Sequence, residues 1–117
     1  MAKGVLVVQT APISPERTQE YHDWYNETHL PEVLSIPGFV QARRFRLVDA
    51  TGATAAGSSA SLMENLAIYE VEADDLSAAF AGLIEAAAAA KLDMSDALQL
   101  NPMPPTQLFE LIADRTL

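Results

Sequence analysis

The alternation of strand-like and helix-like segments constrains the fold of this 117-residue chain more than any other feature. Apolar, β-branched runs predict four strands, at Gly4–Thr10, Phe39–Val48, Asn65–Val71 and Gln107–Ala113. Between them we expect a helix at about residues 15–35 and another that begins at Asp74 or Asp75 and fades near Asp93. The order is βαββαβ. It predicts an α+β, ferredoxin-like fold in which two helices cover one face of a four-stranded antiparallel sheet.

The length leaves room for one core, so we expect residues 1–117 to form a single domain. Ser14, Pro15 and Glu16 suit the start of the first helix. Residues 49–63 are small and polar with two glycines, and we expect them to form a mobile loop that acts as a lid.

Apolar side chains occupy both faces of the first predicted strand, and the last predicted strand repeats the pattern. A strand of this kind is expected to be buried on both sides, yet two helices cover only one face of the sheet. We therefore expect a homodimer in which a second copy covers the other face.

The charge balance excludes several partners. A formal net charge of -9 argues against nucleic acid and anionic membranes, and the only basic cluster is Arg43, Arg44 and Arg46. The absence of cysteine excludes disulfides, thiolate chemistry and Cys-ligated metals. The first apolar run is too short for a signal peptide or a membrane span, so a cytoplasmic location is the default expectation.

The first helix concentrates the only tryptophan, both histidines and two of the three tyrosines. At 100° per residue His22 and His29 fall within about 20° of one another, with Asn26 on the same side. An adjacent stripe is mostly aromatic and is expected to pack on the sheet; it comprises Tyr21, Trp24, Tyr25 and Thr28. Pro31 predicts a kink near Leu30, which places His29 beside a helix break.

The run Trp24-Tyr25-Asn26-Glu27-Thr28-His29-Leu30-Pro31, followed by Ile36-Pro37-Gly38-Phe39 and Ala42-Arg43-Arg44-Phe45, resembles the EthD-like family of dimeric α+β-barrel proteins. The motif covers about residues 20–46, and the order of elements extends the resemblance to the whole chain. The resemblance implies two sheets packed face to face in a dimer, a pocket between sheet and helices, and cofactor-independent acid/base chemistry. His29 matches the motif histidine; Trp24, Tyr25, Asn26 and Pro31 match its flanking positions.

His29 is the candidate general acid or base, with a structural role at the kink as the alternative. His22 is expected to be a solvated surface residue. Trp24, Tyr25 and Asn26 are candidate substrate-binding residues, together with Tyr69 if it faces the pocket. The His-x6-His spacing does not fit a zinc motif, so we expect neither metal nor cofactor.

Arg44 is the remaining candidate for substrate binding. It shares a strand face with Arg46, and a buried arginine requires a carboxylate. The sequence offers Glu70, Glu110 or the acid group of a substrate, and the alternative is an ion pair at a sheet edge or dimer rim.

The leading hypothesis is a cofactor-independent isomerase, lyase or dehydratase that uses His29 on a small hydrophobic cyclic or aromatic catabolite or a polyketide-like molecule. One alternative is a non-catalytic binding or accessory protein of a catabolic pathway. Another is an oxygen-using or haem-dependent barrel monooxygenase, in which His29 would hold the haem.

Overall fold

The structure is a computed structural model and describes residues 1–51, 63–101 and 103–117. Its elements are, in chain order, β1 (Ala2–Thr10), a 3-10 turn (Pro15–Arg17), α1 (Thr18–Trp24), a π-helical turn (Tyr25–His29), α2 (Leu30–Leu34), β2 (Phe39–Arg46), β3 (Asn65–Ala73), α4 (Leu76–Ala88) and β4 (Thr106–Glu110). The expected βαββαβ order is confirmed. Most of the proposed lid, residues 52–62, lies outside the described part of the chain.

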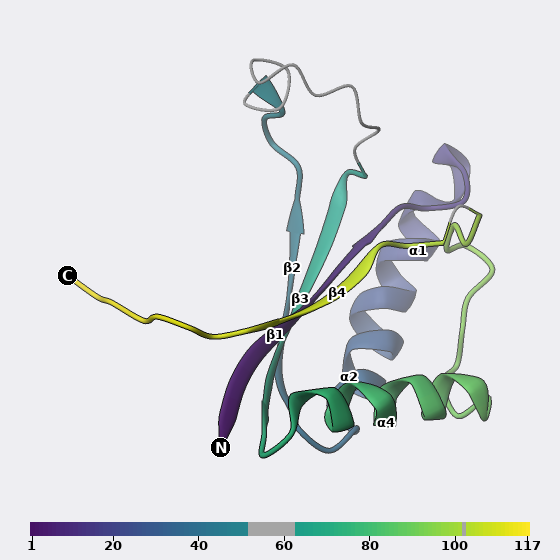
Figure 1. Cartoon of the computed structure of the whole chain (residues 1–117). Coiled ribbons are helices and arrows are strands. Elements are labelled where there is room, and N and C mark those ends of the chain that lie inside the picture. The colour runs from purple at the N-terminus through teal and green to yellow at the C-terminus, as the bar shows by residue number, and fades with distance from the viewer. Residues whose placement is uncertain (52–62, 102) are drawn as a thin grey trace.

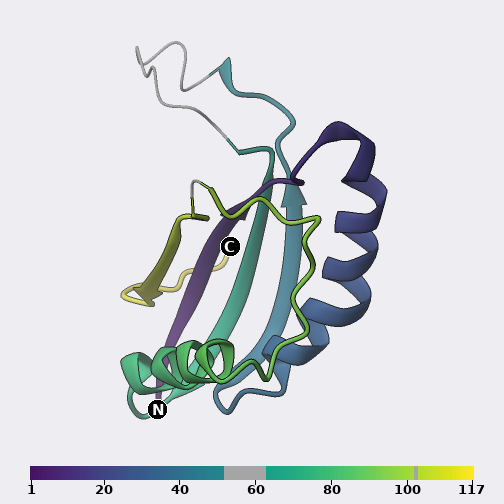
Figure 2. The ribbon, with the colours of Figure 1, turned by 90° about the vertical axis from the view of Figure 1, so that its right-hand side faces the viewer.

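The four strands form one antiparallel sheet in the order β2-β3-β1-β4. The α1–α2 helix and α4 lie on the same side of this sheet, as Figures 1 and 2 show. The core fills the space between the two layers. Its largest fully buried side chains are Leu6, Tyr21, Tyr25, Val33, Tyr69 and Val71. The predicted α+β, ferredoxin-like fold is therefore confirmed.

A β-bulge between Phe39 and Gln41 reverses part of the predicted strand pattern. Because Phe39 and Phe45 are six residues apart, the alternation of an unbroken strand would put both on one face. The extra residue of the bulge shifts the alternation. Phe39 pairs with Val71 and is buried under the helices, whereas Phe45 pairs with Leu66 on the other face and is 46% exposed.

The ends predicted for the second helix and the last strand are wrong. Helix α4 ends at Ala88 rather than near Asp93, because Ala90 takes a left-handed conformation (φ 56°) and the Lys91 N–H turns back to the Ala86 carbonyl. That pairing is a known way to end a helix. Strand β4 ends at Glu110, and Ile112 lies in the tail beyond it, almost fully exposed.

The face of the sheet away from the helices carries an apolar surface, which we call the open face. In Figure 1 the C-terminal tail leaves the sheet on this side. Strand pairing and the burial pattern place these side chains on it: Val5, Val7, Phe45, Leu66, Ile68 and Phe109. None of the helices in the described residues is long and apolar enough to cross a membrane.

Candidate functional site

The helix that carries the candidate residues widens before its proline instead of breaking. The N–H of Leu30 donates to the carbonyl of Tyr25, five residues earlier, and Leu30 keeps helical angles (φ -58°, ψ -48°). The expected helix break beside His29 is therefore wrong, because the chain stays helical through Leu30. In a regular helix the Pro31 ring would clash with the backbone carbonyl of Glu27, four residues earlier. We attribute the wide π turn to that clash.

His29 lies at the end of this turn between two aromatic rings. Its imidazole stacks on Trp24 at 4.7 Å and meets the edge of Tyr25 at 5.0 Å between ring centres. Burial, and secondarily the positive charge of Arg44, lowers the pKa of His29 to about 4. The buried Nδ1 atom has no hydrogen-bond partner among the described residues. His29 is therefore a neutral imidazole with a nitrogen free for a further partner.

Trp24 holds the segment after α4 against the helix. Its indole N–H donates to the Asp93 carbonyl at 2.6 Å, while the Glu32 carboxylate accepts from the Asp93 backbone N–H. Trp24 thus packs against His29 and also anchors the segment after α4. Sequence analysis missed this connection, because nothing in the local pattern near Asp93 signals it.

Tyrosine hydroxyls meet beneath the helix, on the covered face of the sheet. Tyr21 and Thr10 share a hydrogen bond of 2.5 Å. The hydroxyl of Tyr69 interacts electrostatically with Tyr25, yet it is buried and makes no hydrogen bond of ordinary geometry within the described residues. Burial is the main cause that raises the pKa of Tyr69, so its hydroxyl stays protonated and able to donate.

Arg44 extends from β2 toward the same helix. Its Nη1 donates to Asn26 Oδ1 at 2.7 Å, and its Nη2 lies 3.2 Å from His22 Nδ1. The guanidinium carbon also sits 5.3 Å from the centre of the Tyr21 ring. The arginine that pairs with Glu70 is Arg43, at 3.6 Å on the open face. The expectation that a carboxylate of Glu70 or Glu110 serves Arg44 is therefore wrong.

His22 is also placed differently from the expectation of a solvated residue. It is half-buried against Tyr21 and Arg44. Burial, then the charges of Arg44 and Arg46, lowers the pKa of His22 below its usual value, while Asp23 opposes them. An Nδ1 atom that accepts from Arg44 leaves the proton of the neutral ring on Nε2.

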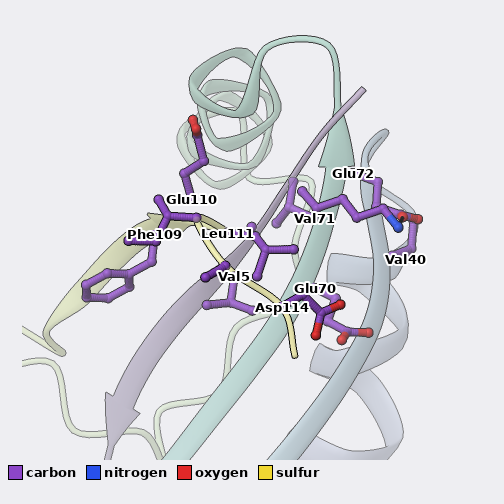
Figure 3. A pocket seen from close by; sticks show the side chains of 13 residues that line it. Val5, Val40, Glu70, Val71, Glu72, Phe109, Glu110, Leu111 and Asp114 are labelled. Atoms are coloured by element: carbon purple, nitrogen blue, oxygen red, sulfur yellow. Dashed lines mark ion pairs between the residues drawn. The ribbon is translucent and has the colours of Figure 1, made fainter. Parts of the chain in front are cut away.

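Two hollows bear on the site. One of about 390 Å³ opens beside Arg44, on the helix-covered side of the sheet. A second, of about 630 Å³, lies on the open face under the C-terminal tail, where Figure 3 shows Leu111 and Asp114 passing over the sheet near Val5 and Glu70. His29 lines neither of them.

The structure therefore brings most of the predicted site residues together, in two connected groups. His29, Trp24 and Tyr25 form one group, and Asn26 and Arg44 form the other, joined through the Tyr25 ring. Tyr69 borders the first group through Tyr25. In the described part of the chain, no three His, Cys, Asp or Glu side chains are grouped as metal ligands.

No family model and no curated protein matches the chain. A solved structure does: a protein of the ethyl tert-butyl ether D (EthD) family from Bacillus halodurans C-125, 18% identical, with a TM-score of 0.60 over 96% of this chain and 100% of the other. The chain has the EthD fold. At this identity the likeness establishes architecture alone, and the EthD-like resemblance of the sequence motif is confirmed at that level.

Proposed function

We propose that this EthD-like protein is a cofactor-independent enzyme that moves a proton on a small organic molecule, with His29 as the base. The buried, unpaired Nδ1 of His29 carries the proposal. Buried polar atoms in folded proteins nearly always have a hydrogen-bond partner. The unpaired imidazole nitrogen of His29 therefore favours a polar partner from outside the chain, a ligand or a water molecule.

The sequence left open whether His29 acts as an acid or as a base, and its lowered pKa favours the base. At pH 7, a group with a pKa of about 4 is protonated in only about one molecule in a thousand. His29 would thus start as a base. Arg44, whose charge already acts on His29, supplies a positive centre for the negative charge that develops when a carbon-bound proton is removed.

Tyr69 complements this arrangement. Its hydroxyl remains protonated and would donate to a carbonyl oxygen of the substrate, which makes the neighbouring carbon more acidic. Substrate classes consistent with this chemistry are small cyclic or aromatic ketones, lactones and polyketide-like molecules. A binding or accessory protein would hold such a molecule without the proton transfer.

Deuterium exchange separates these two functions without knowledge of the natural substrate. The protein would be incubated in D2O with a panel of cyclic ketones and lactones, and NMR would follow exchange of the proton next to the carbonyl. We expect accelerated exchange with the wild type and a loss of about 10²- to 10⁴-fold in His29→Ala. The exposed Glu27→Gln, two residues away in the same turn, is the matched control.

A binding protein would give no accelerated exchange for any member of the panel. Equal exchange with wild type and His29→Ala would remove the base from the proposal. Retention of the melting temperature in His29→Ala is the accompanying check that the variant folds.

The proposed assembly is a homodimer formed through the open face. Phe45 and Phe109 are 46% and 49% exposed there, at opposite edges of the sheet, with the valines of β1 between them. An apolar face that spans all four strands is what a second copy of the chain would cover.

A further inference from the structure

Arg44 is a half-buried cation without an acidic partner. Three of the seven basic side chains form ion pairs in the described residues, namely Lys3, Arg17 and Arg43. Apart from Arg44, the basic side chains without an ion pair in the described residues are all exposed to water: Arg46, Lys91 and Arg115. Residues 52–62 and 102 contain no Asp or Glu, so the rest of the chain holds all 16 carboxylate side chains, and none lies within ion-pair distance of Arg44.

The hollow beside Arg44 is positive in an otherwise acidic chain. Its walls include two arginines, Arg44 and Arg46, and none of its lining residues is acidic. The other polar walls are neutral side chains: Gln19, His22, Asn26 and Asn65. The nearest acid that acts on His22, Asp23, is held by the Gln19 amide at 2.8 Å. A net charge of -9 makes this local excess of positive charge conspicuous.

The neutral partners of Arg44 leave donors free. Asn26 accepts from Nη1 and His22 from Nη2, which uses two of the five N–H groups of the guanidinium. These two contacts fix the plane of the guanidinium but supply no negative charge. A carboxylate matches the remaining geometry, because arginine binds carboxylates through parallel N–H donors.

We propose that the Arg44 hollow binds a carboxylate, so that the substrate is a small organic acid held by its acid group at Arg44. This inference rests on the proposed function and names its substrate class. A volume of about 390 Å³ fits a small molecule. Arg44 and His29 contact the same Tyr25 ring, which links the proposed anion site to the proposed base.

Benzoate and benzamide, which have nearly the same shape and differ in charge, test the proposal in titrations of the full chain by calorimetry. We expect benzoate to bind and benzamide to bind far more weakly. Arg44→Gln should weaken benzoate binding by between about 10-fold and about 100-fold, the effect of losing a charged hydrogen-bonding partner. Arg43→Gln removes the same charge one residue away on the open face and should leave affinity unchanged.

A second readout follows the site directly. Arg44 is, after burial, the main cause that lowers the pKa of His22, and Arg46 adds to it against Asp23. An anion at Arg44 offsets both positive charges. The pKa of His22, measured by NMR titration, should therefore rise when benzoate saturates the protein. It should not rise with benzamide.

Equal affinity for benzoate and benzamide, no binding of either, or unchanged benzoate binding in Arg44→Gln would overturn the inference. Preference for inorganic phosphate or sulfate over benzoate would overturn the assignment to a carboxylate. If Arg44→Gln fails to fold, Arg44→Lys keeps the charge without the paired donors and should bind benzoate with intermediate affinity. His29→Ala should bind benzoate normally. A wild-type protein that binds benzoate but accelerates no proton exchange would refute the proposed function and leave this site standing.

Discussion

The guanidinium carbon of Arg44 lies 4.2 Å from the centre of the Tyr25 ring, within the range of a cation-π contact. The edge of the same ring system meets His29, so one tyrosine separates the cation from the imidazole. This arrangement keeps a positive charge close enough to act on His29 without a direct contact. Burial, with this charge as the second cause, lowers the pKa of His29 and so gives the stability of the protein a defined dependence on pH.

We expect the free energy of unfolding to fall as the pH drops from about 6.5 to about 4. The folded protein lowers the pKa of His29 to about 4, so in this window the unfolded chain binds more protons and acid favours unfolding. The contribution is fully present above pH 6.5 and reaches an upper limit of about 3 kcal/mol. Denaturant unfolding of wild type and His29→Phe across this range measures it.

His29→Phe keeps the ring packing against Trp24 and Tyr25 but removes the proton. The pKa of His22 is lowered in the same direction and remains in both proteins, so the informative quantity is the difference between their slopes. Parallel curves for the two proteins would contradict the pKa of about 4.

We expect a dimer of about 25 kDa in sedimentation, twice the chain mass of 12.6 kDa. Phe109→Glu puts a charge on the open face and should give a folded monomer, because this side chain is already 49% exposed in the single chain. Ile84→Glu, at a similarly exposed position on α4, is the control and should remain dimeric. A monodisperse wild-type monomer at tens of micromolar would refute the barrel assembly.

Gly4→Ala should destabilise the fold by at least about 1 to 3 kcal/mol, the usual cost of forcing extra atoms into a packed core. An added Cβ would lie 2.3 Å from the Phe109 carbonyl oxygen and 2.9 Å from Leu76 Cδ1. The carbonyl belongs to β4 and cannot move without disturbing its pairing with β1.

Gly82→Ala is the matched comparison, since its Cβ would meet nothing closer than 3.6 Å and α4 gains a better helix former. It should stabilise the protein by about 0.5 to 1 kcal/mol. Thermal unfolding of both variants decides; a loss of stability in Gly82→Ala similar to that in Gly4→Ala would contradict the close approach at Gly4.

Ala90→Gly should raise the free energy of unfolding by about 1 kcal/mol. Ala90 is the non-glycine residue with positive φ in the described chain, and glycine adopts that conformation without a Cβ penalty. Ala89→Gly, at the preceding residue where φ is -85°, should bring no such gain. A decrease in stability for Ala90→Gly in chemical denaturation would rule out strain at this helix end.

The sequence predicted the order of elements because strand and helix periodicities are local properties. It missed the two places where one residue is inserted. One is the bulge beside Phe39, and the other is the wide turn before Pro31. Neither changes the local pattern of apolar and polar residues in the sequence, yet each shifts the side chains that follow. The end of the last strand was misplaced because only tertiary pairing fixes where a strand ends: pairing with β1 stops at Glu110.

The candidate site was predictable in composition and less so in contacts. A helix that holds both histidines and the tryptophan indicated where chemistry would gather. The sequence did not show which of Arg43 and Arg44 faces the helices, because neighbouring arginines on one strand differ only in the face of the sheet on which they lie. The neutral partners of Arg44 lie 18 and 22 residues away in sequence.

The wide turn at Tyr25–His29 makes the helix tolerant of changes in length at one point. Tyr21 before the turn and Val33 after it are both fully buried and hold the two halves on the sheet. Removal of one residue between them, for example Glu27, would convert the turn to a regular helix while both anchors keep their places. Tyr25 would keep its place relative to Tyr21, and His29 its place relative to Val33, because one helical turn joins each of them to its anchor. Variation in length, usually confined to surface loops, would in this protein be absorbed within a helix and leave the reactive group where it is.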